Sequence, residues 1–489
     1  MKQSLKQSRR DFLIRTTCAG LSAAAAQSSL RKLGLMNLYA RPKAPTDYRA
    51  LVCIFMDGGN DSNNLVVPRD SYYTNQYAVA RPANSGLQIP LGSLLPINNP
   101  PSLGGRSFGF HPSLADDPVT FYPGLASLFN SGKLAVVSNV GPLVVPVTQS
   151  NIDSLPTPYS LFSHSDQIEA WQTARADQRI GTGWGGRIAD DTVGCNGGSG
   201  FPTVTTIAGA STFTVGAGQR PLAIDTGALD QVLVLNGFYG SPGDVARKTS
   251  MDYARTIDRT ATLIAAASDT TQQAVDISAA LSVDPTLATV FPGTDLGSQL
   301  QQVAKVMKLN LSSAELSLNR QIFYVETGGY DTHQDQATDQ ANNLTELSQA
   351  IGAFYQATLE LGIADRVVTF TLSDFGRTLQ PSGDQGSVGT DHGWGSHQFV
   401  LGNAVAGADF YGVPNSSTGQ IFPQLVFGGP DDISNDDRGR WIPTTSVEQY
   451  AGTLARWFGV SALDLPVVLP LVGNFSPTTL GFLTPGTSC

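Results

Sequence analysis

Three apolar segments place the strongest constraint on the fold. Each is followed directly by a loop that contains acidic residues and glycine. The segments comprise residues 48–56, 321–325 and 366–372. Uninterrupted apolar runs of this length are typical of strands buried on both faces, as in a parallel sheet. Helical apolar spacing over 298–308 and 344–361 precedes the second and third runs. This alternation of helix and strand predicts an α/β fold with a mostly parallel sheet.

Composition limits the partners of such a fold. The chain has 489 residues, of which 41% are hydrophobic, enough for a large core. Its 30 basic and 40 acidic residues give a formal net charge of −10, and no basic block interrupts the sequence. We therefore expect no binding to nucleic acid or anionic membranes through general electrostatics. The 51 glycines and 29 prolines predict a loop-rich structure.

The N-terminus has the features of an export signal. Two adjacent arginines, Arg9 and Arg10, precede a modest apolar stretch that ends at Ala26. This start resembles the twin-arginine signal, so residues 1–26 are predicted to be removed, with cleavage after Ala40 as the second choice. Residues 45–489 are then a single domain in the periplasm or outside the cell, and the export machinery is a partner. No later apolar run is long enough to span a membrane.

The chain has four cysteines, and disulfide bonds between cysteines form in oxidising compartments. Cys18 would leave with the signal, and Cys53 lies inside a predicted strand as a small core residue. An oxidising compartment permits a disulfide between Cys195 and Cys489, with free thiols as the alternative.

Acidic residues soon after the three predicted strands indicate a metal site. The carboxyl ends of parallel strands meet at one edge of the sheet, where ligands bind. Asp57, Asp331 and Asp374 would therefore come together, and close carboxylates repel one another unless a cation or a proton separates them. A metal ion is the simplest explanation.

Histidine supplies the second argument for metal. The chain has five histidines, and three of them belong to two aspartate-containing motifs, at 331–333 and 391–397. Imidazole together with carboxylate suits Zn²⁺, Mn²⁺ or Fe²⁺ better than Ca²⁺. We expect one or two divalent ions, with zinc or manganese favoured; solvated loops are the alternative. The predicted ligands are Asp57, Asp331, His333, Asp374, Asp391, His392 and His397.

A set of motifs resembles a known family. The motifs lie at 55–68, 110–117, 132–141, 161–173, 183–191, 328–333, 373–378 and 391–397. Together with the twin-arginine start they resemble the bacterial exported family called domain of unknown function 1501, which is similar to the alkaline phosphatase and sulfatase superfamily. The resemblance implies an α/β/α sandwich with a hydrolytic site at the strand ends. A loop-rich insertion or cap is expected at 195–295.

The resemblance also implies roles for several ligands. Asp57 matches the first-strand aspartate of the superfamily, and Asp331 with His333 resembles the pair that binds one metal. Asp374 resembles an aspartate that His or Asn usually follows, but Phe375 stands there instead. His392 or His397, with Asp391, is expected to replace the missing ligand.

The nucleophile implied by the superfamily is a serine, a threonine or a modified cysteine. The sulfatase cysteine motif is absent from the sequence, which argues against a formylglycine sulfatase. Ser163 is the favoured nucleophile and His164 beside it is a second predicted catalytic residue, because a predicted helix begins there and helix N-termini attract anions. Ser165 and Ser62 are alternatives. A helix cap with a packed histidine is the competing interpretation of this segment.

These residues predict an exported, metal-dependent hydrolase of phosphate or sulfate esters. Its substrate would be an anionic ester, with sugar derivatives among the candidates. Arg377 is predicted to hold the non-bridging oxygens by a bidentate contact, with a surface salt bridge as the alternative. Two other functions remain open: a non-catalytic metal- or glycan-binding protein of the same fold, and an assembly factor for a neighbouring exported protein.

Overall fold

The computed structural model describes most of the chain after residue 46. The described residues are 47–489 except 198–200, 230–240, 258, 282, 313–315, 384–385 and 434–436. The predicted signal peptide, with either cleavage position, lies outside the described residues.

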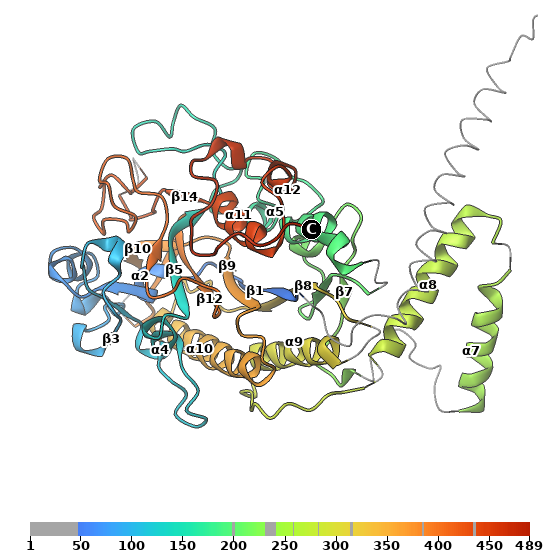
Figure 1. Ribbon diagram of the computed structural model, residues 1–489. Helices are drawn as coiled ribbons and strands as arrows, with labels where there is room; N and C mark the ends of the chain where they lie inside the picture. Colours follow the sequence, from blue (N-terminus) through green and yellow to red (C-terminus); the bar gives the residue numbers. More distant parts are fainter. Residues whose placement is uncertain are drawn as a thin grey trace, which may run out of the picture.

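A mixed, mostly parallel nine-stranded sheet forms the centre (Figure 1), with strand order β13-β5-β12-β9-β1-β8-β6-β7 and β14 paired to β5. The three predicted strands are confirmed as β1 (Arg49–Met56), β8 (Arg320–Thr327) and β9 (Val367–Ser373), with β1 parallel to both others. β12 runs antiparallel to its two neighbours. The remaining strands are β5 (Leu134–Gly141), β6 (Val204–Thr206), β7 (Leu222–Ala223), β12 (Ser396–Leu401), β13 (Phe410–Tyr411) and β14 (Thr445–Ser446).

Helices cover both faces of the sheet, because alternate side chains of a strand point to opposite sides. Ala50, Val52 and Ile54 of β1 belong to one apolar core with α9 and α10, whereas the residues between them belong to a second core with α5, α6 and α11. The predicted α/β class is therefore confirmed. The bounds are α9 (Asp295–Ser312), α10 (Gln336–Glu360), α5 (His164–Thr173), α6 (Trp184–Thr192) and α11 (Val447–Phe458).

The segment expected to be an insertion, 195–295, has two parts. It supplies β6 and β7 to one edge of the sheet. It also forms α7 (Pro242–Ala254) and α8 (Thr262–Ala280), which project from the body in Figure 1. α7 buries none of its residues, so the sheet strands and not this helix tie the segment to the core.

Two smaller sheets extend the strand ends. β10 (Arg377–Ser382) and β11 (Gly389–His392) form an antiparallel hairpin in which Arg377 pairs with His392. The hairpin thereby brings two predicted site residues together. The other small sheet contains β2 (Val66–Pro68), β4 (Phe108–Phe110) and β3 (Leu95–Pro96).

A disulfide joins Cys195 to Cys489 across 294 residues of sequence. It ties the C-terminal tail to the turn that follows α6. Cys53 lies buried in β1 as a free thiol. Within the described part of the chain, no helix is both long and apolar enough to cross a membrane.

Candidate metal centre

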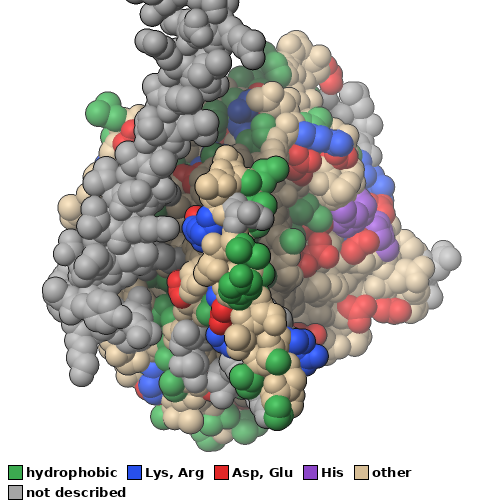
Figure 2. All heavy atoms as spheres, turned by 90° about the vertical axis from the view of Figure 1, so that its right-hand side faces the viewer, with side chains coloured by type: hydrophobic (Ala, Val, Ile, Leu, Met, Phe, Trp, Pro, Cys, Tyr) green, Lys and Arg blue, Asp and Glu red, His purple; other side chains and the backbone are tan. Residues whose placement is uncertain are grey.

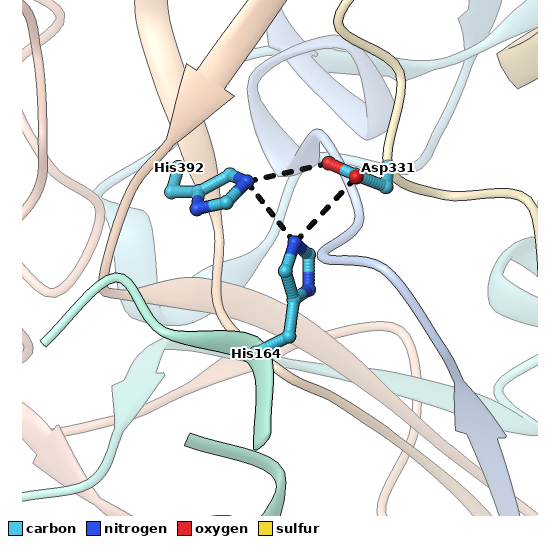
Figure 3. Close-up of side chains that lie close together, drawn as sticks. All are labelled: His164, Asp331 and His392. Carbon is cyan, nitrogen blue, oxygen red and sulfur yellow. Dashed lines mark hydrogen bonds and ion pairs between the residues drawn. The ribbon is translucent and has the colours of Figure 1, made fainter. Parts of the chain in front are cut away.

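Four side chains from distant segments converge at the carboxyl edge of the sheet. Histidine side chains lie at the surface there among acidic ones (Figure 2). His164 is the first residue of α5, Asp331 and His333 follow β8, and His392 ends β11. In Figure 3 the side chains of His164, Asp331 and His392 point toward one common centre.

The polar atoms of this group lie at the spacing of ligands around one ion. The Nε2 of His392 is 3.0 Å from the Nε2 of His164 and 3.3 Å from Oδ1 of Asp331. The His164 Nε2 lies 3.5 Å from Oδ2 of Asp331. His333 joins the group, with its Nε2 3.0 Å from that of His392 and 3.1 Å from Oδ1 of Asp331. A tetrahedral zinc ion with bonds of about 2.0–2.1 Å separates its ligand atoms by about 3.3 Å.

The hydrogen-bond partner of each Nδ1 orients the imidazole and bears on whether its Nε2 is available as a ligand. The Nδ1 of His392 lies 2.7 Å from the carbonyl oxygen of Phe162. A carbonyl can only accept, so Nδ1 carries the proton and the neutral ring presents an unprotonated Nε2 to the centre. The Nδ1 of His164 lies 2.7 Å from Oδ2 of the buried Asp374, an arrangement that orients metal-bound histidines. When both rings are neutral, two nitrogen lone pairs face each other at 3.0 Å, an arrangement that a cation between them would stabilise.

The surroundings of His164 and His392 shift the pKa values of these two histidines in opposite directions. The hydrogen bond with Asp374 raises the pKa of His164, whereas burial lowers the pKa of His392. The ligand set of two imidazoles and one carboxylate suits zinc, manganese or iron. The centre is also open on one side, because the side chains of Asp331 and His333 are 46% and 44% exposed.

The glycines after β1 allow two loops to approach closely. Gly58 has φ +115°, and a Cβ there would lie 2.3 Å from the backbone nitrogen of Asp331. Its own N–H donates to Oδ1 of Asp374 at 3.0 Å. A side chain at residue 58 would therefore displace the loop that carries two of the four converging residues.

Arg377 lies behind the centre and contacts protein groups. Its Nη1 is 2.7 Å from Oδ1 of Asp331, and the same guanidinium donates to Gly58 and Thr390. The side chain is completely buried. Neither sequence interpretation, substrate clamp or surface salt bridge, describes this buried contact, in which Arg377 orients the Asp331 carboxylate.

The remaining predicted ligands lie at the margin of the group. Asp57 is half-buried beside Asp374 and Glu326, and burial with these neighbouring charges raises its pKa to about 6. Asp391 lies 3.3 Å from the Nδ1 of His333 and pairs with Arg438. Asp374 and Asp391 thus contact histidines of the group from behind.

His397 lies apart from the group. It belongs to β12, is 1% exposed, stacks on Phe422 and accepts a hydrogen bond from the Asn139 N–H through Nδ1. Burial lowers the pKa of His397 to about 3. The strand alternation turns this side chain into the core.

A buried neutral histidine of this kind predicts acid sensitivity. The unfolded chain binds a proton near pH 6.5 and the folded one only near pH 3, so stability should fall as the pH drops below 6.5. The loss is about 1.4 kcal/mol per pH unit. His397→Asn keeps an acceptor for Asn139 but cannot be protonated, so its free energy of unfolding should change less between pH 6.5 and 4.5. Urea titrations in chelator at both pH values test this; identical pH dependence of the two proteins would contradict it.

The candidate nucleophiles occupy three different environments. Ser163 is the half-buried N-cap residue of α5, directly before His164. Its hydroxyl donates to the carboxylate of Asp166, which lowers the pKa of Asp166. Ser165 is exposed. Ser62, in the short helix α2 (Ser62–Leu65), is 1% exposed and lies in the core.

Sequence reasoning missed three features of the centre. It assigned His164 to catalysis, whereas the structure places it in the converging group. It gave no role to Phe162, whose carbonyl orients His392, or to Arg440, whose Nε donates to the His392 carbonyl at 2.7 Å. The Ser-His-Ser triplet before a predicted helix was the available signal for His164. No local pattern marks Phe162 or Arg440.

Fold and site together define an α/β protein with a strand-end histidine–aspartate group. The chain belongs to the family described as "Protein of unknown function (DUF1501)", whose model matches residues 48–420. The expected family is therefore confirmed. No curated protein matches the chain significantly.

Solved structures with distant similarity include a periplasmic domain, a sulfatase and an alkaline phosphatase. The C-terminal periplasmic domain of EcEptC from Escherichia coli, in complex with Zn, is 10% identical over 74% of this chain and 77% of that one, with a TM-score of 0.27. PsFucS1 sulfatase from Pseudoalteromonas sp. is 9% identical over 79% and 68%, with a TM-score of 0.23. Alkaline phosphatase from the Antarctic bacterium TAB5 is 10% identical over 74% and 93%, with a TM-score of 0.21.

Proposed function

We propose that the protein is a metal-dependent hydrolase of phosphate or sulfate esters. The residues that would hold one divalent ion are His164, Asp331 and His392, and His333 lies beside them. The observation that carries the proposal is the meeting of two imidazole nitrogens and a carboxylate at 3.0–3.5 Å, with both imidazoles oriented from behind. A cation bound between these groups would offset the negative charge of the carboxylate and accept the lone pairs of neutral imidazoles.

Other residues of the chain hold the proposed ligand side chains in fixed orientations, as such chemistry requires. When bound, a divalent ion polarises the ester oxygens and stabilises charge on the leaving oxygen. Asp374 and the Phe162 carbonyl fix the ring planes of two ligands, and Arg377 fixes the carboxylate of the third. The partial exposure of Asp331 leaves one side open to an ester.

Ser163 remains the proposed nucleophile. It directly precedes a ligand, and the Asp166 carboxylate that accepts its hydrogen bond is positioned to receive its proton. In this step the serine oxygen bonds to phosphorus or sulfur, the ester bond to the alcohol breaks, and water later hydrolyses the serine ester. The alcohol leaves first and the inorganic or monoester product second.

Replacing Ser163 by Ala should lower kcat by at least about 100-fold while metal content stays unchanged, since a nucleophile acts in the transition state. Steady-state kinetics with p-nitrophenyl esters, together with metal analysis of each protein, measure both quantities. Ser165→Ala is the matched control and should retain activity.

Other results would show which part of the proposed mechanism is wrong. Full activity of Ser163→Ala with an inactive Ser165→Ala would transfer the role to Ser165. Full activity of both variants would leave water as the attacking group. A metal-loaded wild type that hydrolyses no phosphate or sulfate ester would contradict the proposal and favour a non-catalytic metal-binding protein.

Export by the twin-arginine route, to the periplasm or beyond the cell, is part of the same proposal. The Arg9-Arg10 pair and the disulfide between Cys195 and Cys489 support it, because stable disulfides are typical of oxidising compartments.

A further inference from the structure

We infer that this site prefers esters with a single negative charge over the doubly charged phosphate monoesters. The singly charged class includes sulfate monoesters, phosphodiesters and phosphonate monoesters. This inference rests on the proposed function and names the substrate class within it. It is carried by the way the site's arginines and carboxylates are paired.

Each arginine at the centre is engaged with the protein. Arg377 is buried against the Asp331 carboxylate and the Gly58 and Thr390 carbonyls. Arg438 pairs with Asp391. These two guanidinium groups therefore neutralise carboxylates that contact the ligand group and do not extend toward a substrate.

Arg440 is held in a similar way. Its Nε donates to the backbone carbonyl of His392 at 2.7 Å, and its guanidinium stacks 4.5 Å from the ring centroid of Phe162. Phe162 has φ +73° and presents its carbonyl to the same His392. Arg440 thus connects the two segments that carry His164 and His392.

Carboxylates outnumber these arginines. Among the residues that the structure describes, five carboxylates and three arginines surround the centre, which leaves two negative charges, and one divalent ion cancels them. Acidic side chains also stand beside the histidines in Figure 2. The carboxylates are Asp57, Glu326, Asp331, Asp374 and Asp391.

The charge balance distinguishes ester classes. With the ion bound, the centre has no surplus positive charge among its described residues to match a dianion. A second negative charge on the ester then lies near the half-buried Asp57 carboxylate without a paired cation, and like charges at short range disfavour binding. Specificity can arise from such a repulsive element as well as from attraction.

The test compares two substrates that differ in one charge. p-Nitrophenyl phosphate and p-nitrophenyl methylphosphonate share a leaving group, and a methyl group replaces one charged oxygen in the second. The metal-loaded protein is assayed at pH 8, where the phosphate ester is a dianion. Each kcat/KM is divided by the uncatalysed rate constant in the same buffer. We expect the methylphosphonate to be favoured by at least about tenfold.

A charge-removing variant separates electrostatics from shape. Glu326 accepts a hydrogen bond from the Tyr324 hydroxyl at 2.7 Å and adds negative charge near Asp57. Glu326→Gln should reduce the preference about threefold or more by improving the phosphate ester. Asp365→Asn, an exposed residue just before β9 at the opposite end of that strand, removes the same charge and should leave the preference unchanged.

The outcomes are distinct. An equal or greater efficiency with p-nitrophenyl phosphate would overturn this inference and leave the proposed hydrolase intact. A preference that is unaltered in Glu326→Gln would overturn its electrostatic cause. Turnover of neither ester by protein with a measured metal content would overturn the inference and the proposed function together.

Discussion

Addition of Zn²⁺ or Mn²⁺ to the metal-free protein should raise its melting temperature, because an ion that binds only the folded state stabilises it by mass action. At about 1,000 times the dissociation constant the gain is about 4 kcal/mol. For a chain of this length that corresponds to roughly 4 °C, when the specific unfolding entropy is scaled with residue number. Thermal scans with and without the ion measure the effect.

Replacing His392 by Ala should abolish this stabilisation, since the Nε2 of His392 lies within 3.3 Å of three other polar groups of the centre. His164→Ala should act in the same way. Asp365→Asn is the matched control: it removes a carboxylate at the opposite end of β9 and should retain the full shift. An unaltered melting temperature of the wild type with either ion would contradict the metal site.

Removal of the disulfide should produce the other large loss of stability. The bond between Cys195 and Cys489 spans 294 residues of sequence, and cross-links across long loops restrict the unfolded chain most. The chain-entropy relation gives about 5–6 kcal/mol for a loop of this size, an upper value because strain and residual structure reduce it. The double Cys195→Ser, Cys489→Ser variant should therefore unfold at a clearly lower urea concentration.

Two controls isolate the bond from the side chains. Addition of a reductant should lower the stability of the wild type toward that of the double-serine variant and leave the variant unchanged. Cys53→Ala tests the buried thiol in β1 and should leave the response to reductant intact. A wild type whose urea midpoint is insensitive to complete reduction would show that the tail contributes nothing through this bond.

The effect of the disulfide follows from where it lies. The C-terminal tail passes near the start of β1, where the Gly486 N–H donates to the Arg456 carbonyl and the Cys489 N–H donates to that of Gly459. These contacts anchor the tail at the end of the sheet opposite the metal centre. Loss of the bond should therefore reduce stability with little effect on metal affinity.

The sequence by itself determined the parts of the fold that depend on local pattern. The apolar runs that became β1, β8 and β9 are buried on both faces, so their composition alone distinguishes them from amphipathic segments. Asp331 and His333 were recognisable for the same reason, because a parallel strand delivers whatever follows it to the ligand-binding edge.

Tertiary structure decided what pairs across long separations. His164 and His392 are 228 residues apart, and no local pattern in either segment announces the other. The ring of Phe375, which follows Asp374, lies with its centroid 4.9 Å and 4.7 Å from those of the His164 and His392 imidazoles. These contacts between three separate segments come from packing and have no local pattern in the sequence.

Side-chain direction also lay beyond the sequence. His392 and His397 share one glycine-rich motif, and a bend within it turns the first toward the centre and the second into the core of β12. Arg377 was predicted to bind substrate because the sequence shows the charge of this side chain but not its burial. Its partner, the Asp331 carboxylate, comes from the loop after β8, 46 residues away. Spacing along the chain fixes which residues reach the sheet edge, whereas packing between segments fixes the direction in which each of them points.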